Sequence, residues 1–349
     1  SGLKKSLRLI YVYAIAAGAI FTFIGYWDTI FYEYCGAGTF FGFILMTLLI
    51  LPIAMVYCEL APLFPKAGGE LIYNTVGFNR HVGFLASWLI MAAWISVPPA
   101  VVMAIVTFIS RTFGLGLTFG HTMIIGIIIL VAVFLMSMQD IQFLVKAQAV
   151  CLFANITTTL LTGVLLLFSG HWSFANVANL FQTNLEPSAG IPGWIIGMAL
   201  LITPFFGFET VPQMVEEGDF PTSNTKKAIC GSVLTCGTIY VFFFFCVAGL
   251  DSFQTLLSGD AQNGFMTITA MQNLLGWKIW PLIYGCVSIL MGMTDSILGF
   301  WMSTARMLYS MGKKNFLPEI FTKVNSHQQP ILPNLFLLGI SLTFILLQN

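Results

Sequence analysis

The sequence predicts an all-α protein that spans a membrane many times, and two observations support this prediction. Of the 349 residues, 58% are hydrophobic and only 8% are charged. Soluble domains are about one quarter charged, so this chain cannot cover an aqueous surface. Apolar stretches of about 17 to 25 residues, which is the length that crosses a bilayer as a helix, recur along the chain. We place nine spans near residues 7–33, 38–61, 83–110, 121–138, 143–169, 192–215, 228–250, 278–311 and 330–347.

Basic residues between these spans predict the orientation of the protein, because Lys and Arg concentrate in short cytoplasmic loops. Lys4, Lys5 and Arg8 lie at the start of the first span, and Lys66 and Arg80 lie between the second and third. Lys146 lies at the start of the fifth span, and Lys226 and Lys227 follow the sixth. Arg306, Lys313, Lys314 and Lys323 lie at or after the end of the eighth. With the N-terminus inside, these twelve of the 14 basic residues are cytoplasmic, and Arg111 and Lys278 are outside. We therefore expect a multi-pass protein of the cell membrane with a cytoplasmic N-terminus.

Charge and motif content exclude several classes of function. The net charge is zero, with 14 basic and 14 acidic residues, which gives no reason to expect nucleic acid as a partner. The seven cysteines are scattered without metal-ligand spacing, so we interpret them as inert thiols and expect no metal. The sequence shows no Ser-His-Asp set, H-E-x-x-H motif or Gly-rich phosphate loop, and its four histidines fall at span ends. We expect neither an enzyme nor a bound cofactor.

Two of the predicted spans contain residues that interrupt a helix. The first includes the segment Ala16–Asp28, with two glycines, and the sixth includes Ile202–Pro212, with two prolines, a glycine and a carboxylate. In hydrocarbon such an interruption persists only where the freed backbone groups face protein or a watery cavity. Four spans separate the two, which is the placement expected when each of two inverted five-helix repeats begins with a discontinuous helix. The alternative is that Pro204 kinks a packed helix and that Gly18 lets two helices approach closely.

Three motifs in the same order resemble those of a known group of transporters. The segment Glu59–Tyr73 is similar to E-L-x-x-x-F-P-x-A-G-G-x-x-x-Y, and Phe206–Pro221 is similar to G-F-E-x followed by E-E-x-x-x-P. A third segment, Ser303–Met311, resembles an S-R-x-L-Y-x-M helix end. By these motifs the chain is identified as a member of the amino acid-polyamine-organocation superfamily, of the amino acid permease type.

The resemblance implies the leucine-transporter fold and alternating access to the two sides of the membrane. Residues 1–349 would form one permease domain, with a first repeat over about 7–169 and a second over about 192–349. The family usually has about twelve helices, so with nine spans the second repeat would lack its last member, and the sequence would be either a fragment or a departure from the fold. The start at Ser-Gly rather than Met agrees with a piece of a longer protein, and we see no signal peptide.

The resemblance also places the substrate between the two interrupted helices. The substrate-binding residues that we predict are Thr22, Phe23, Ile24, Gly25, Pro204, Phe205, Phe206, Gly207, Phe208 and Glu209. Phe23 and Ile24 stand where the family usually has small residues that let a carboxylate approach backbone N–H groups. We therefore expect a ligand with an amine, either an amino acid or a small amine. Trp94 and Tyr26 are further candidates to gate the pocket.

Polar residues within the spans predict a coupling or cation pathway. Its members are Asp28, Asn155, Thr294, Asp295 and Ser296. Asp295 has no cation close by in its span and is predicted to carry a proton or to bind a cation. Asp28 either binds a cation or lies exposed at an extracellular lip, and Glu209 either serves a substrate or proton pathway or accepts hydrogen bonds from a neighbouring helix. Asn155 falls about where some proton-coupled relatives have Lys, so H⁺, Na⁺ and exchange all stay open.

The sequence-based hypothesis is thus a secondary transporter that moves an amino acid or small amine across the cytoplasmic membrane. The alternative is a non-transporting amino acid or amine sensor on the same fold. The predicted partners are a small-molecule substrate and the lipid bilayer, and the oligomeric state is left open.

Overall fold

The computed structural model describes residues 3, 5–258 and 265–347, and this part of the chain is helical without a β-strand. The first half contains α1 (Leu9–Phe21), α2 (Asp28–Cys35), α3 (Thr39–Leu63), α4 (Gly69–Gly77), α5 (Arg80–Thr112), α6 (Phe119–Ser137) and α7 (Ile141–Leu167). The second half contains α8 (Phe174–Val177), α9 (Gly193–Leu200), α10 (Val211–Met214), α11 (Thr225–Ala248), α12 (Phe253–Leu257), α13 (Met266–Asn273), α14 (Ile279–Gly285), α15 (Gly292–Lys313) and α16 (Ile331–Leu346). The prediction of an all-α protein is confirmed.

Seven helical segments of the described chain are long and apolar enough to cross a membrane. They are Asp28–Leu63, Arg80–Thr112, Phe119–Ser137, Ile141–Leu167, Gly193–Glu217, Thr222–Ala248 and Ile279–Lys313. Two shorter apolar helices, Leu9–Ile24 and Ile331–Leu346, lie where we place the first and last spans. The count of nine is therefore confirmed only in part. The difference at the start arises because the outer half of the first predicted span, α2, continues through a short turn into α3.

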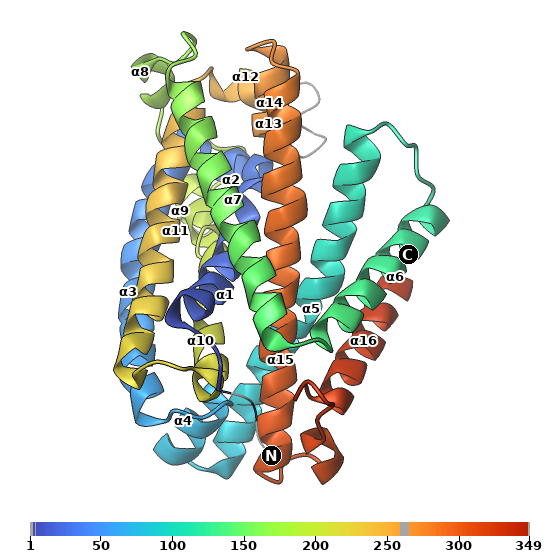
Figure 1. Ribbon diagram of the computed structural model, residues 1–349. Coiled ribbons are helices and arrows are strands. Elements are labelled where there is room, and N and C mark those ends of the chain that lie inside the picture. Colours follow the sequence, from blue (N-terminus) through green and yellow to red (C-terminus); the bar gives the residue numbers. More distant parts are fainter. Residues whose placement is uncertain (1–2, 4, 259–264, 348–349) are drawn as a thin grey trace.

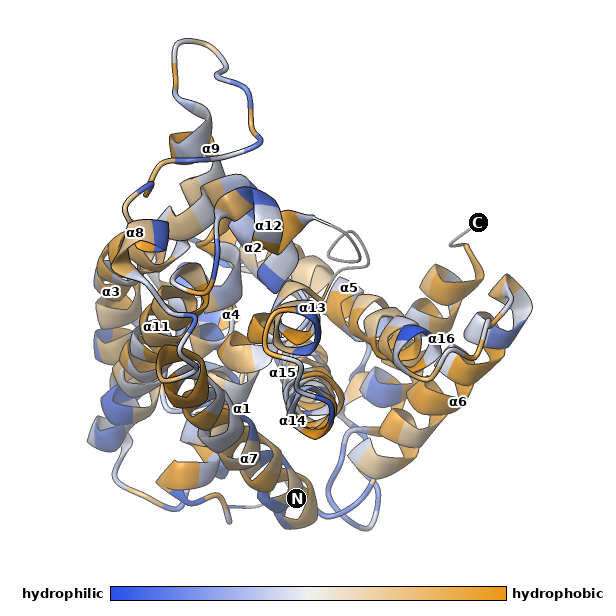
Figure 2. Cartoon of the chain, turned by 90° about the horizontal axis from the view of Figure 1, so that it is seen from above, coloured by the Kyte–Doolittle hydropathy of each residue, from blue (hydrophilic) through white to orange (hydrophobic). Residues whose placement is uncertain are grey.

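The helices form a bundle around α1, which packs against α7, α11 and α15. On one side α11 also packs against α3, and on the other α5 packs against α15. Figures 1 and 2 both place α6 and α16 next to each other at the edge of the molecule, away from α3 and α11. Hydrophobic residues cover the outer helices (Figure 2), as a surface in contact with lipid requires.

The first predicted interruption is confirmed. α1 ends at Phe21, a single 3₁₀ turn follows over Thr22–Ile24, and α2 begins only at Asp28. Two side chains satisfy carbonyl groups near the end of α1. The Thr22 hydroxyl donates to the carbonyl of Gly18 at 2.9 Å, and the Tyr240 hydroxyl on α11 donates to the carbonyl of Ile20 at 2.8 Å. The interruption is thus buried inside the protein, where its freed groups have partners.

The second predicted interruption is also confirmed. α9 ends at Leu200, and two 3₁₀ turns, Thr203–Phe205 and Phe208–Thr210, flank an extended Phe206 before α10 begins. Between the two turns, Gly207 has a φ of +153°, which a residue with a side chain rarely adopts. A Cβ at this position would lie 2.9 Å from the backbone nitrogen of Ile20. The glycine therefore lets the two interrupted helices touch at their backbones.

Candidate substrate and ion site

A cavity of about 380 Å³ lies beside the interruption that follows α9. Five separate parts of the chain line it. They contribute Phe23 after α1, Ile50, Ile53 and Tyr57 from α3, Ile90, Ala93, Trp94 and Val97 from α5, Thr203, Phe206, Phe208 and Glu209 from the interruption, and Phe300 from α15. Its wall is apolar and aromatic, and Glu209 is the carboxylate that lines it. Such a cavity suits a ligand with an apolar body and few polar groups.

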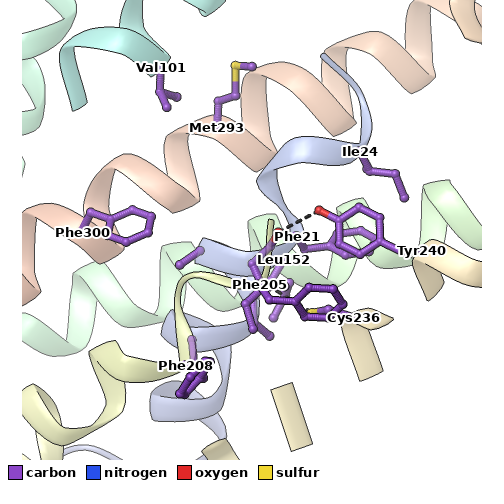
Figure 3. Close-up of a cluster of buried hydrophobic side chains, with 14 of the residues drawn as sticks. Phe21, Ile24, Val101, Leu152, Phe205, Phe208, Cys236, Tyr240, Met293 and Phe300 are labelled. Carbon is purple, nitrogen blue, oxygen red and sulfur yellow. Dashed lines mark hydrogen bonds between the residues drawn. The ribbon is translucent and has the colours of Figure 1, made fainter. Parts of the chain in front are cut away.

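Four of the predicted substrate-binding residues line this cavity, namely Phe23, Phe206, Phe208 and Glu209. The others lie in the packed interior around it. Phe205 is fully buried and packs against Phe43 and Tyr240, in the cluster that Figure 3 shows. Thr22, Ile24 and Pro204 are also buried and are absent from the cavity wall, and Gly207 contacts α1.

The sequence predicts that Gly25 binds the substrate, but in the structure Gly25 packs against Ser288. A Cβ at this position would lie 2.3 Å from the hydroxyl of Ser288, in the π-helical segment Cys286–Met291 before α15. A larger residue at Gly25 would thus displace this segment rather than fill the cavity.

Glu209 uses both of its carboxylate oxygens for hydrogen bonds within the protein. Oε1 accepts from the indole nitrogen of Trp94 on α5 at 3.2 Å, and Oε2 accepts from the backbone nitrogen of Gly207 at 2.7 Å. The side chain is 5% exposed. Glu209 therefore connects α5 to the interruption and stabilises its unusual backbone while also facing the cavity. The two roles that the sequence left open for Glu209 are compatible in this geometry.

Asp295 lies at the contact between α15 and α1. A Cβ on Gly18 would lie 1.9 Å from one carboxylate oxygen of Asp295, so the carboxylate packs directly on the backbone of α1. The side chain is 1% exposed, and within the described residues neither of its oxygens accepts a hydrogen bond of normal geometry. The amide of Gln148 on α7 donates to the Asp295 backbone carbonyl at 3.0 Å. Burying a carboxylate without a partner is costly, so this position is unusual for packing alone.

The other predicted pathway residues have different surroundings. Asn155 on α7 approaches Gly292 at the start of α15, and the buried hydroxyl of Ser296 has no hydrogen-bond partner in the described chain. Thr294 instead donates to the carbonyl of Leu290 at 2.7 Å, within its own helix. Asp28 is absent from the cavity wall and belongs to a separate part of the fold.

Asp28 is fully buried, so the interpretation of an exposed extracellular lip is wrong. Its Oδ1 accepts from the backbone nitrogen of Thr29 at 2.7 Å, and its Oδ2 accepts from the backbone nitrogen of Thr267 at 2.9 Å. Thr267 lies in the first turn of α13, where unpaired N–H groups favour a carboxylate. Asp28 thus attaches α13 to α2.

Below the cavity, hydrogen bonds close the end of the bundle at which the N-terminus lies (Figure 1). Gln213 on α10 is fully buried. Its side chain bonds to Gly68, in the loop before α4, and to Glu70, in the first turn of α4. Its oxygen accepts from the backbone nitrogen of Gly68 at 3.0 Å, and its nitrogen donates to Glu70 at 2.8 Å. The Ser310 hydroxyl on α15 donates to the carbonyl of Ala67 at 2.7 Å. The loop is therefore held between α10 and α15.

Glu70 is a functional candidate that the sequence analysis missed. It is 5% exposed, although it belongs to a short helix between two spans, and no feature of the sequence distinguishes it from a solvated loop residue. Burial raises its pKa to about 7, and the negative charge of Glu209 contributes to the rise. Hydrogen bonds from Tyr57 and Gln213 act in the opposite direction.

We expect the raised pKa of Glu70 to make stability depend on pH. The folded protein keeps the Glu70 carboxyl protonated up to about pH 7, whereas the unfolded chain releases this proton near the ordinary pKa of 4.5. The stabilisation that the bound proton gives to the folded state is therefore fully present below about pH 4.5 and is lost as the pH rises through about 7. The loss is roughly 3 kcal/mol for a shift of this size. Thermal unfolding in detergent across this range measures it, and Glu70→Gln should remove the dependence. An unchanged dependence in Glu70→Gln would contradict this account.

The fold and the site define a class of protein. Two interrupted helices meet at mid-bundle next to a cavity, which is the arrangement of the leucine-transporter fold. The family description "Amino acid permease" matches residues 7–349, so the chain belongs to this family. Over the described residues the structure agrees with that of a Na⁺-coupled sialic acid symporter in a substrate-bound, outward-open state, with a TM-score of 0.63. The two chains are 15% identical, and the match covers 96% of this chain and 71% of the symporter chain.

Curated relatives are similar to this chain at low identity. The glutamate/serine transporter AimA of Bacillus subtilis (strain 168) is 24% identical over 84% of this chain and 56% of its own length. The branched-chain amino acid permease BcaP of Lactococcus lactis subsp. cremoris (strain MG1363) is 20% identical over 85% of this chain and 66% of its own length. The methylthioribose transporter of Bacillus subtilis (strain 168) is 22% identical over 96% of this chain and 72% of its own length. Against several relatives, AimA among them, this chain spans only about half of the relative's length.

Proposed function

We propose that this chain forms a permease domain with two repeats that moves an amino acid or a small amine across the cell membrane by alternating access. The observation that carries the proposal is the pair of interrupted helices that meet beside an apolar cavity. Broken helix ends supply backbone groups and dipole charge at mid-membrane, where a transporter binds its substrate. The family and the named transporters support the same function. No covalent chemistry is required, and the N-terminal end of the bundle would face the cytoplasm.

The wall of the cavity supports a substrate with an apolar body and an amine. Aromatic rings from all five lining parts of the chain, among them Phe23, Trp94 and Phe300, surround the space, and Glu209 provides a negative charge. Rings of this kind attract a cation through their faces. Phe23 also occupies space near the end of α1 that the carboxylate of an amino acid would need, which favours amines over zwitterions.

Uptake into proteoliposomes tests the transport function. We expect accumulation or counterflow of a labelled apolar amino acid or of the corresponding amine, with the amine competing at least as well. Binding without uptake or counterflow would instead favour the sensor. Competition by zwitterions alone would contradict the role of Phe23.

We further propose that Asp295 is the coupling site, for a proton or for a cation held together with Asn155 and Ser296. Asp295→Asn mimics the protonated carboxyl, so we expect it to retain substrate binding and to remove the pH dependence of uptake. The exposed Asp219→Asn is the matched control and should keep the pH profile of the unaltered protein. An unaltered profile in Asp295→Asn would assign Asp295 to packing, and Glu209 would then become the leading proton site.

A further inference from the structure

A second cavity, of about 280 Å³, lies at the N-terminal end of the bundle and is separate from the substrate cavity. Three lysines line it, together with Glu216, Tyr309 and Ser310. Lys313 and Lys314 come from the end of α15, whereas Lys66 comes from the loop between α3 and α4. The cavity thus lies between two parts of the chain that must separate if this end of the bundle opens.

The charges of this cavity are not balanced within the described residues. None of the three lysines forms an ion pair there, and Glu216 is the carboxylate on the wall. One oxygen of Glu216 already accepts from the backbone nitrogen of Ala67 at 3.0 Å. Lysines at the end of α15 alone would be explained by the helix dipole. All three lysines are exposed, and the preference of basic residues for the cytoplasmic side accounts for their presence at this end of the bundle. Lys66 nevertheless comes from a different element, so like charges from two parts of the chain gather at one cavity.

Tyr309 adds a buried polar group without a partner to the wall of this cavity. Its side chain is 1% exposed and lines the cavity, and its hydroxyl has no hydrogen-bond partner among the described residues. The ammonium of Lys313 lies 5.4 Å from the centre of its ring. A buried hydroxyl without a partner costs free energy that an acceptor oxygen in the cavity would recover.

We propose that this cavity binds a phosphate-type anion that connects α15 to the loop between α3 and α4. The anion's oxygens would accept from the lysine ammonium groups and from the Tyr309 hydroxyl. The same loop is already held by Ser310 on α15 and by Gln213 on α10. A bound anion adds a further link between these parts, so it favours the state in which this end of the bundle is closed.

Two sources can supply such an anion, namely the headgroup of an anionic lipid and free phosphate in solution. The full chain is therefore reconstituted in two ways. One arm uses nanodiscs of phosphatidylcholine with inorganic phosphate titrated into the solution. The other arm uses phosphate-free buffer and nanodiscs in which phosphatidic acid replaces part of the phosphatidylcholine. A ligand that binds the folded state raises the unfolding temperature, and the arm that responds identifies the source.

Substitutions in the wall of the cavity test whether the rise in unfolding temperature comes from an anion bound there. We expect the apparent affinity to fall roughly fivefold for each lysine removed in Lys313→Gln and Lys314→Gln, and about tenfold in Tyr309→Phe, which loses only the hydroxyl. The control is Lys226→Gln with Lys227→Gln, because these exposed lysines begin α11 and do not line the cavity. The proposal is overturned if neither arm responds, if the control pair weakens binding as much as the Lys313 and Lys314 pair, or if Tyr309→Phe binds like the unaltered protein.

Discussion

Arg306→Met is expected to destabilise the protein by about 3 to 5 kcal/mol, because it leaves a charge buried without its partner. Arg306 on α15 and Glu217 after α10 are both 1% exposed. The guanidinium makes two bonds to the carboxylate, of which the Nη2 to Oε1 bond is 3.0 Å long. Arg306 also donates to the carbonyl of Met302 and to Gln329. The substitution removes these contacts and leaves the Glu217 carboxylate in an apolar interior.

A double-mutant cycle separates the loss of the pair from the cost of the unpaired charge. Thermal unfolding in detergent is measured for Arg306→Met, for Glu217→Met and for the two together. The double variant should be more stable than either single variant, because apolar replacements of a buried pair leave no charge behind. Additive losses would contradict the prediction, since they would mean that the two side chains do not depend on each other.

Gly207→Ala is expected to cost about 4 kcal/mol, for two physical reasons. A φ of +153° is strained by about 1 to 3 kcal/mol in a residue with a side chain. The added methyl would also lie 2.8 Å from the Cβ of Ala19 and 2.9 Å from the nitrogen of Ile20, and such overpacking costs about 1 to 3 kcal/mol more. The two interrupted helices would have to move apart next to the proposed substrate cavity, so we expect ligand binding to weaken together with stability.

Gly339→Ala is the matched control for this substitution. Gly339 lies inside α16, and a Cβ there would meet nothing within 4 Å. Alanine at such a helical position should raise stability by about 0.5 to 1 kcal/mol. Thermal unfolding of both variants in the same detergent compares them directly. If Gly207→Ala unfolds at the temperature of the unaltered protein, the close approach of the two helices does not contribute to stability.

Features that depend on local sequence were predicted well. The apolar segments indicate the helices to within a few residues, because a helix that crosses hydrocarbon must be both apolar and long enough. Pro204 and Gly207 likewise mark the second interruption, since proline lacks an N–H and glycine allows unusual backbone angles. At the first span the pattern also indicates an interruption, but not that α2 continues into α3.

Positions of individual side chains were predicted less well. Gly25 and Asp28 both lie near the first interruption in sequence, yet Gly25 packs on Ser288 and Asp28 caps α13. Each contact joins residues more than 200 positions apart, and no local pattern encodes which of two faces a side chain will present. Glu70 was missed for the same reason, because its burial depends on Gln213 from another helix.

The sequence by itself determined that this is an all-α membrane protein with two interrupted helices, and its motifs carried the resemblance to the permease family. Composition and helix-breaking residues act locally, so one chain without its structure is sufficient to reveal the spans and the interruptions. Only the tertiary structure decided which residues face the apolar cavity beside the second interruption, that the Asp295 carboxylate lies on the backbone of α1, and that three lysines meet beside Tyr309. These features arise from helix packing, and packing depends on the fit of distant surfaces rather than on the residues of any single segment.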